Sequence, residues 1–329
     1  MPAEPGTEPE VLPPLPVEAS GGQKVAVGGH ELNLTNLSKL FWPEEGYTKF
    51  DLINYYFRVS SFVIPHLANR PLSLKRYPEG SRGAFFFQKN APPETPAWVK
   101  RQRIYHEDSR EGVDYIICND LSTLLYLANL ACVSQNPWLS ALPDIERPDI
   151  IALDLDPSDP EDFEGCIEVA HLVKEQLTRF GLVGFPKTSG ATGIHIYVPL
   201  APRYTYAQAR QFAEIIAMMC REERPDLITL ETAVEKRGGK LYLDYLQNVK
   251  GKTLASAYSV RARPGAPVST PLRWEELKSG LKPADFSLGN VTGRLEREGD
   301  LFQGVLTAKQ DLVEALRHGE RYLRKAGRP

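Results

Sequence analysis

The sequence lacks the features that would place the protein in a membrane, in an oxidising compartment or among strongly basic binders. No apolar stretch of the 329-residue chain is long enough to cross a bilayer, and no charged-then-apolar signal opens it. Its four cysteines lie far apart without Cys-x-x-Cys spacing, so we expect reduced thiols in a cytoplasmic protein and no zinc site. The net charge of −3 argues against a globally basic nucleic-acid binder.

Two further features that are absent from the sequence exclude classes of protein. The chain has no Walker loop, because no Gly-Lys-Ser/Thr follows its one small-residue turn, and it has no internal repeat. What it does have is 42% hydrophobic and 25% charged residues, enough to bury one large core or two modest ones. Residues 1–22 are rich in proline, glutamate and glycine, which predicts a disordered leader.

A pair of aspartates closes an apolar run that predicts a buried strand. Ile150–Leu153 is short and apolar, and a proline ends the run soon after. Strand side chains alternate between faces, so Asp154 and Asp156 share one face. Neighbouring carboxylates repel unless a cation lies between them, and hard divalent cations prefer oxygen ligands. The pair therefore indicates a metal site. The alternative of a helix cap is weakened, because Ser158 or Asp159 can supply that cap.

A tight turn and a histidine follow in a second pair of expected strands. The turn Gly190–Gly193 leads into a strand whose aliphatic residues alternate with His195 and Tyr197, so the histidine faces away from the expected core. Glycines let backbone amides approach an anion, and Ser189 can donate to a phosphate. The turn favours phosphate binding, and a purely structural role of His195 stays open.

A third carboxylate lies in an aromatic-aliphatic strand. Asp244 follows Leu241–Leu243, and an unpaired aspartate would be costly to bury there. It could complete a three-carboxylate site of the kind in which two divalent ions promote phosphoryl transfer. It could instead pair with Arg237 or Lys240, and the spacing along the chain leaves both alternatives open.

These segments, in this order, resemble the motifs of a known family. Asp154-Leu155-Asp156-Pro157, Ser189-Gly190-x-x-Gly193-x-His195 and Asp244-Tyr245-x-Gln247-Asn248 are similar to motifs I, II and III of the archaeo-eukaryotic primase superfamily. More narrowly, residues 30–300 resemble the polymerase domain of bacterial DNA ligase D. Further matches in the same order are Leu34–Asn36, Trp42-Pro43, Lys75–Pro78, Phe85–Lys89, Phe185–Thr188 and Ala257–Arg261.

The resemblance implies an α/β (α+β) primase-polymerase fold, in which a catalytic module like an RNA-recognition motif packs on an N-terminal mixed α/β module. After the leader 1–22 we expect the N-terminal module in 23–145, the catalytic module in 146–300 and a basic C-terminal helix or tail in 301–329. A capping box at Thr48-x-x-Asp51 predicts a helix start, and helices are expected at 120–133, 160–180 and 206–222. No ligase or nuclease sequence accompanies the polymerase, so we expect a stand-alone polymerase or an excised domain.

The resemblance also assigns roles to residues of the catalytic module. Asp154, Asp156 and Asp244 would be catalytic and would bind two divalent cations, Mn²⁺ or Mg²⁺, for the primer 3′-hydroxyl and the incoming triphosphate. Residues expected to hold the nucleotide are Ser189, Gly190, Thr192, His195, Gln247, Lys252, Arg261 and Asn136. Two of these depart from the family pattern, since some members carry a lysine at the position of Thr192 and a histidine in the step where Asn136 stands.

Contacts with DNA are implied in the same way. Phe86 and Phe87 would stack on the template, and Lys75, Arg76 and Arg237 would bind DNA beside them. Lys39 and Lys49 match the family's pocket for a downstream 5′-phosphate. Lys49 also falls at an expected helix N-terminus, where free amides and the helix dipole favour phosphate. Without the resemblance, both lysines would be read as ordinary surface charge.

The function implied is that of a nucleotidyltransferase that extends or fills DNA ends and gaps in double-strand break repair by non-homologous end joining, with a preference for ribonucleotides. Implied partners are DNA with a 5′-phosphate, ribo- or deoxynucleoside triphosphates, the Ku protein and a separate or fused DNA ligase, in the cytoplasm at the nucleoid and away from membranes. Two alternatives stay open: a primase that starts chains de novo, and a non-catalytic module that binds or bridges DNA ends. Three carboxylates facing DNA argue against the non-catalytic alternative.

Overall fold

The computed structural model describes residues 9–19, 21–106 and 111–325, which form two compact units. Within the described residues, unit 1 comprises the chain up to Trp138 together with Leu254–Thr270 and Ala284–Asp300. Unit 2 comprises Leu139–Thr253, Pro271–Pro283 and the chain from Leu301 onward. Each unit is therefore assembled from segments that are distant in the sequence.

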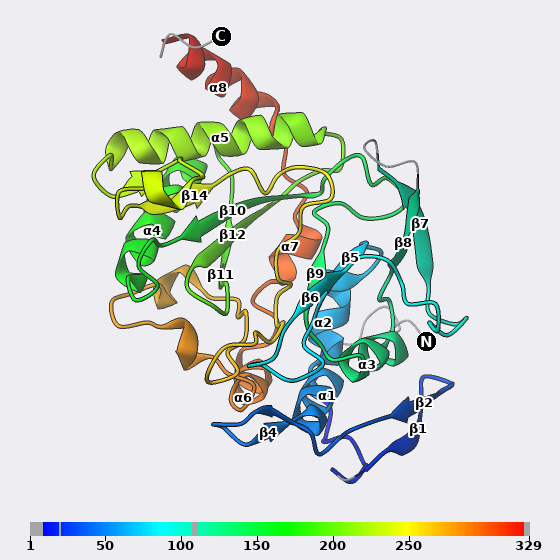
Figure 1. Cartoon of the computed structure of the whole chain (residues 1–329). Coiled ribbons are helices and arrows are strands. Elements are labelled where there is room, and N and C mark those ends of the chain that lie inside the picture. The colour runs from blue at the N-terminus through cyan, green and yellow to red at the C-terminus, as the bar shows by residue number, and fades with distance from the viewer. Residues whose placement is uncertain (1–8, 20, 107–110, 326–329) are drawn as a thin grey trace. The chain divides into compact units, whose positions relative to one another are not determined.

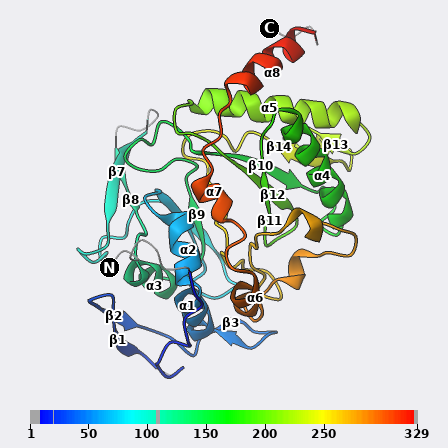
Figure 2. The same ribbon diagram turned by 180° about the vertical axis from the view of Figure 1, so that it is seen from behind.

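Unit 2 is built on a five-stranded sheet in the order β11-β12-β10-β14-β13 (Figure 1; β13 is labelled in Figure 2). Its central strand β10 is antiparallel to both β12 and β14, and β13 is parallel to β14. The strands are β10 (Ile150–Asp156), β11 (Phe185–Thr188), β12 (Ile194–Pro199), β13 (Ile228–Thr229) and β14 (Leu241–Asp244). Helices α4 (Phe163–Arg179) and α5 (Tyr206–Glu223) contact one another and both contact β10, so they cover one face of the sheet.

The alternation along these strands separates an apolar face from a polar one. Leu153 and Leu155 of β10 oppose Ile196 and Ile194 of β12, and all four are buried. Leu177 of α4 and Ile196 of β12 would lie 2.7 and 2.9 Å from a Cβ at Gly184, so the apolar face lies under the helices. Asp154 and Asp156 consequently lie on the opposite face, as the alternation predicts.

Unit 2 has four further elements among the described residues. They are η1 (Val234–Lys236), η2 (Trp274–Glu276), α7 (Gln303–Thr307) and α8 (Val313–Lys325), the last two seen best from behind (Figure 2). Phe302, which precedes α7, packs its ring 5.3 Å from that of Tyr197 on the polar face of β12. No helix in the described part of the chain is both long and apolar enough to span a bilayer.

Unit 1 surrounds a three-stranded sheet in the order β6-β5-β9 with helices and hairpins. The sheet consists of β5 (Leu72–Arg76), β6 (Phe86–Gln88) and β9 (Cys132–Pro137). The hairpins are β1 (Gln23–Val27) with β2 (His30–Leu34), β3 (Leu40–Trp42) with β4 (Tyr47–Thr48), and β7 (Arg101–Tyr105) with β8 (Gly112–Ile116). The helices are α1 (Lys49–Arg58), α2 (Ser60–Leu67), α3 (Leu121–Asn129) and α6 (Val291–Glu298); the short turn η3 (Pro283–Asp285) precedes α6.

Local sequence signals account for several of these boundaries. The predicted capping box is present: Thr48 accepts from the amide of Asp51, and Asp51 accepts from the amide of Thr48, so α1 begins at Lys49. The helix expected at 120–133 is shorter than predicted. It ends at Asn129, because Ala131 takes a positive φ of 60° and the chain then enters β9. The helix expected at 160–180 begins at Phe163, and its cap is Asp162, neither Ser158 nor Asp159.

The division into units differs from the modules expected from the sequence. Residues 254–270, expected in the catalytic module, belong to unit 1, where the amide of Ser256 donates to the carbonyl of Gln135 on β9. Part of the segment expected to be a disordered leader packs on unit 1 instead: Leu15 is buried, and its amide donates to the side chain of Asn54 on α1. Residues 1–8 and 20 of that leader lie outside the described residues. The four cysteines, all described, are free and buried.

Candidate functional site

The register of unit 2's sheet places Asp154 between two other polar side chains. On one side Asp154 pairs with His195 of β12, and on the other it pairs with Asp244 of β14. Side chains directly opposed in an antiparallel ladder have their Cβ atoms about 4.5–5.5 Å apart. The Nε2 atom of His195 lies 3.3 Å from Oδ1 of Asp154. Two of the three predicted catalytic carboxylates and the predicted histidine therefore converge at the centre of the sheet.

Asp244 is buried and well supplied with hydrogen-bond donors. Its carboxylate accepts from the hydroxyl of Tyr242 at 3.0 Å, from the amide of Leu246 at 2.7 Å and from the side-chain amide of Gln247 at 2.8 Å. Burial, followed by the nearby Asp244 charge, raises the pKa of the Tyr242 hydroxyl well above its ordinary value. Tyr242 therefore keeps its proton at neutral pH and donates a hydrogen bond to Asp244, which stabilises the buried carboxylate.

Asp156 is engaged by an arginine. Nη1 of Arg237 lies 3.0 Å from Oδ2 of Asp156, and the guanidinium also lies over the ring of Tyr242, 4.4 Å from its centroid. Arg237 is buried, with Nη2 donating to the carbonyl of Thr232. The sequence alternative that pairs Arg237 or Lys240 with Asp244 is thus wrong, since Arg237 binds Asp156 and Lys240 donates to the carbonyl of Pro225.

His195 has a second charged neighbour that the sequence analysis did not single out. Lys187 of β11 pairs with His195 in the ladder, and its Nζ lies 2.8 Å from Nδ1 of the imidazole. The lysine is fully buried. Counting residues back from the Ser189–Gly193 turn would have found this pair, because a hairpin closed by that turn sets residue 187 opposite residue 195.

The turn before His195 is held together by its own serine. The Ser189 hydroxyl oxygen accepts from the amides of Ala191 and Gly193, and the Ser189 amide donates to the Gly193 carbonyl. Those two amides thus point at Ser189, whereas the sequence analysis expected amides of this turn to face an anion. Gly193 lies so close to β10 that a Cβ there would be 1.9 Å from the carbonyl oxygen of Leu155. The turn is therefore fixed against the strand that carries Asp154 and Asp156.

The other predicted nucleotide-binding residues are divided between the units. Thr192 and Gln247 are partly exposed in unit 2, and Lys252 is exposed there. Asn136 and Arg261 lie in unit 1, where the amide of Asn136 donates to the carbonyls of Ser73 and Ser134. Because its side chain is buried and bonded within its own sheet, Asn136 serves the strand pairing of unit 1 in this structure.

Asn248, which follows Asp244 in the third motif, bonds the backbone of β10 with its side chain. Its side-chain oxygen accepts from the amide of Ala152 and its nitrogen donates to the carbonyl of the same residue. The β10–β14 ladder covers only Asp154–Asp156, so the Asn248 side chain takes the place of a strand partner at Ala152. The loop after β14 is thereby tied to the strand that carries the first motif.

Unit 1 carries an aromatic-basic patch, formed by Lys75, Arg76, Tyr77 and Phe85–Phe87. The three phenylalanines are exposed by 44–57%, which is unusual for large apolar side chains. The ammonium of Lys75 lies 4.1 Å from the ring centroid of Phe85, and the guanidinium of Arg76 lies 5.2 Å from that of Phe86. Burial, then Arg261 and Arg263, lower the pKa of Lys75, so these arginines add positive charge near the patch. The predicted DNA-binding residues of this unit therefore lie on one pair of strands, Lys75 and Phe87 with Tyr77 and Phe85 on one face and Arg76 with Phe86 on the other.

The two lysines predicted to bind a 5′-phosphate lie near one another in unit 1 but have internal partners. Lys49 is only 4% exposed, and its Nζ donates to the carbonyl and hydroxyl of Thr35 and to Oδ1 of Asn129. Burial, then the charges of Lys39 and Arg76, lower its pKa to about 8. Lys39 donates to the exposed Glu79. An incoming phosphate would have to replace these acceptors.

Carboxylates are the type of ligand that a hard cation prefers, and one of the three already has a charged partner. Among the described residues, no three acidic, histidine or cysteine side chains stand close enough together to hold a metal ion. Asp154 and Asp244 oppose each other, which matches the oxygen donors that Mg²⁺ and Mn²⁺ prefer. Asp156 accepts from Arg237 through Oδ2, which leaves Oδ1 as the oxygen that could serve as a ligand.

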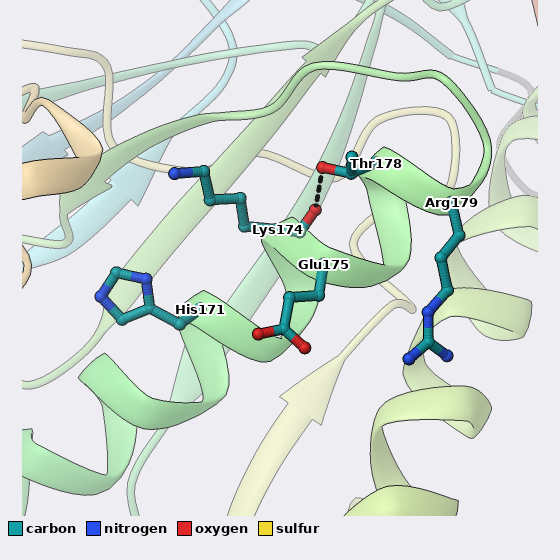
Figure 3. A pocket seen from close by; sticks show the side chains of 5 residues that line it. All are labelled: His171, Lys174, Glu175, Thr178 and Arg179. Atoms are coloured by element: carbon teal, nitrogen blue, oxygen red, sulfur yellow. Dashed lines mark hydrogen bonds between the residues drawn. The ribbon is translucent and has the colours of Figure 1, made fainter.

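One pocket of unit 2 lies apart from these residues. It is a shallow hollow of about 420 Å³ on the surface of α4, lined by His171, Lys174, Glu175, Thr178 and Arg179 (Figure 3). Its lining has its own contacts: His171 bonds the carbonyl of Leu277, and Arg179 pairs with Glu223. None of the predicted site residues lines it, so we assign it no part in the site.

Comparison with known proteins places this geometry in a family. Residues 48–302 match the family model described as LigD, primase-polymerase domain. The chain is 38% identical over 282 residues to the bifunctional non-homologous end joining protein LigD of Bacillus subtilis, covering 85% of this chain and 45% of that protein. It is 32% identical over 273 residues to the multifunctional non-homologous end joining protein LigD of Mycolicibacterium smegmatis, covering 82% of this chain and 35% of that protein. The chain thus spans less than half the length of these curated relatives.

A solved structure agrees in fold. The polymerase domain of Mycobacterium tuberculosis ligase D in complex with DNA superposes with a TM-score of 0.78 at 30% identity, covering 85% of this chain and 99% of that one. The mixed α/β fold class is thereby confirmed, as is the resemblance inferred from the motifs.

We predict that Gly193→Ala lowers the midpoint of thermal unfolding. The added methyl group would collide with the Leu155 carbonyl and push the turn off β10, at a cost of about 1–3 kcal/mol. Gly293→Ala on α6 is the matched control, because the nearest atom there would be 3.5 Å from the new Cβ and alanine favours a helix. Calorimetry of both variants checks this, and a Gly193→Ala protein as stable as the wild type would contradict it.

Proposed function

Because the chain belongs to the family of LigD primase-polymerase domains, we propose that it is a nucleotidyltransferase that extends or fills DNA ends and gaps in double-strand break repair by non-homologous end joining. The observation that carries the proposal is the register of β10. It sets Asp154 of the first motif beside His195 of the second and Asp244 of the third. Residues that are remote in sequence converge on one face of one sheet, as a phosphoryl-transfer site requires.

The three aspartates would hold two divalent cations, Mn²⁺ or Mg²⁺. When bound, such cations supply electrostatic stabilisation of the phosphoryl group under transfer. Asp154 and Asp244 are already opposed, and Tyr242 and Gln247 hold the carboxylate of Asp244 in place. Asp156 would join them through Oδ1, while Arg237 bonds its Oδ2.

The nucleotide's phosphates would be bound by residues around this row of carboxylates. His195 pairs with Asp154 in unit 2, and Ser189 begins the turn before His195; the imidazole and the hydroxyl carry the donor hydrogens that phosphate oxygens need. Gly190, Thr192, Gln247 and Lys252 of the same unit complete the set proposed there. Arg261 and Asn136, which the resemblance also assigns to the nucleotide, belong to unit 1. Thr192 offers a hydroxyl where some family members offer a lysine, so we expect weaker binding of the triphosphate here.

DNA would bind through the aromatic-basic patch. Exposed aromatic rings beside cationic side chains form a stacking platform for unpaired bases. We assign template stacking to Phe86 and Phe87, and backbone contacts to Lys75 and Arg76. Arg237, also expected to bind DNA, is buried on Asp156, so its contact with DNA would require it to leave that carboxylate. The remaining partners proposed are Ku and a separate or fused DNA ligase, since the relatives are named as end-joining proteins.

The proposal predicts that Asp154→Ala, Asp156→Ala and Asp244→Ala each reduce nucleotide addition by about 10²–10³-fold or more, with DNA binding largely intact. Each removes one carboxylate from the proposed cation site. The measurement is extension of a gapped, 5′-phosphorylated duplex, with and without primer, in Mn²⁺ and in Mg²⁺. Asp226→Ala is the matched control, because Asp226 is an exposed carboxylate of unit 2 paired with Arg224. A triad variant with near-wild-type extension would remove that residue from the site.

A second prediction concerns the sugar. We expect a higher kcat/KM for ribonucleotides than for deoxynucleotides, because a site built to bond the 2′-hydroxyl leaves its own polar groups unpaired when that hydroxyl is missing. Single-nucleotide incorporation with matched NTP and dNTP pairs in the same metal gives the ratio. Equal or higher kcat/KM for deoxynucleotides would show that the family's sugar preference does not hold here.

A third prediction concerns the 5′-phosphate. Lys39 and Lys49 should strengthen binding to gapped DNA that carries this group, by about 1–3 kcal/mol. The pKa of Lys49 is lowered to about 8, so its charge is present below pH 8 and lost above it. The phosphate-dependent part of the affinity should therefore fall as pH rises from 7 to 9.

Fluorescence anisotropy on gapped duplexes with and without the 5′-phosphate would measure this gain for the wild type, Lys39→Ala and Lys49→Ala. Lys24→Ala is the control, since Lys24 is an exposed lysine of the same unit paired with Glu31. If Lys39 and Lys49 were ordinary surface charge, their loss would lower affinity for both duplexes equally. A wild-type affinity that does not depend on the 5′-phosphate would also contradict the assignment of a phosphate pocket to these lysines.

A further inference from the structure

Lys187 is a buried lysine beside His195 of the proposed site. Its side chain has no solvent-exposed surface, yet lysine is almost never fully buried unless it is paired. Nζ lies 2.8 Å from Nδ1 of His195 and 5.5 Å from the ring centroid of Tyr197, which lies on the same face of β12. The hairpin of β11 and β12 holds this contact in register.

The chemistry of an ammonium group decides the direction of that hydrogen bond. A lysine ammonium has three hydrogens and no lone pair, so it can only donate. Nδ1 of His195 must then be the acceptor, and the ring hydrogen of a neutral imidazole must be on Nε2. That nitrogen lies 3.3 Å from Oδ1 of Asp154, an acceptor. The opposite tautomer would set two hydrogens against each other at Lys187 and two lone pairs against each other at Asp154.

We propose that Lys187 is a positioning residue, which fixes His195 in one orientation and as the Nε2–H tautomer beside Asp154. Lys187, His195 and Asp154 then form a chain of hydrogen bonds across three adjacent strands, β11, β12 and β10. An outer partner of this kind determines which imidazole nitrogen carries the hydrogen. A role of His195 in binding a nucleotide rests on the proposed function. The effect of Lys187 on the His195 tautomer is independent of that function.

The consequence for the site is that His195 presents a single N–H, from a fixed place, at the row of carboxylates. A ring free to rotate would lose entropy on each binding event and could offer a lone pair to an anion, which repels it. With Lys187 in place, the ring offers its donor toward Asp154 before any nucleotide arrives. The hairpin turn closed by Ser189 stiffens the same two strands.

The test is the tautomer of His195, read by ¹⁵N NMR of the full chain labelled at histidine, at neutral pH and without DNA or nucleotide. The His195 signals are assigned by their loss in His195→Gln. The wild type should show hydrogen on Nε2 only. In Lys187→Met that single state should give way to a mixture, and nucleotide addition should fall by about 10–100-fold. Lys187→Arg, whose guanidinium also only donates, should keep the tautomer and restore part of the activity.

Lys174→Met is the control, because Lys174 is on α4 and its ammonium lies over the ring of Trp274, away from His195. It should leave the His195 signals unchanged. Hydrogen on Nδ1, or on both nitrogens, in the wild type would overturn the proposal, as would an unchanged tautomer in Lys187→Met. If Lys187→Met does not fold, loss of the Nε2–H state in folded Lys187→Arg overturns it instead. Because the spectrum needs no substrate, a failed extension assay alongside a correct tautomer would refute the function and leave this inference standing.

Discussion

The antiparallel register of β10 is the constraint on which the rest of the site depends. It sets Asp154 opposite His195 on one side and Asp244 on the other, while Leu153 and Leu155 face the helices. A slip of one residue would turn the aspartates into the apolar layer and the leucines out of it. The hydrophobic burial that stabilises unit 2 thus also keeps the carboxylates on the polar face, so fold and site are specified by the same pattern.

A cluster of carboxylates at the centre of a sheet must be compensated, and unit 2 does so with separate partners. Arg237 faces Asp156, Tyr242 and Gln247 donate to Asp244, and Lys187 acts on Asp154 through His195. Removing one partner of a buried charged group commonly costs several kcal/mol, because the other charge stays unpaired. Arg237 bonds Oδ2 of Asp156, so the protein's own cation and the proposed metal would act on the same carboxylate.

Much of this arrangement follows from short-range pattern in the sequence. Strand alternation predicts the shared face of Asp154 and Asp156, and the capping box predicts the start of α1. What alternation cannot supply is the neighbour across the sheet: Arg237 could have paired with Asp244, and only the tertiary register directs it to Asp156. The burial of Lys49 and of Asn136 could not be predicted either, because the sequence around a charged or polar residue does not indicate that distant acceptors will surround it.

The central claim is that the carboxylates gathered by the β10 register bind divalent cations. The most direct measurement is a titration of the protein with Mn²⁺, followed by electron paramagnetic resonance, for the wild type and for Asp154→Asn with Asp244→Asn. Asparagine keeps the size of each side chain and removes its charge. The account predicts bound Mn²⁺ in the wild type and its loss in the double variant. Equal binding by the two proteins, or none by the wild type, would contradict it.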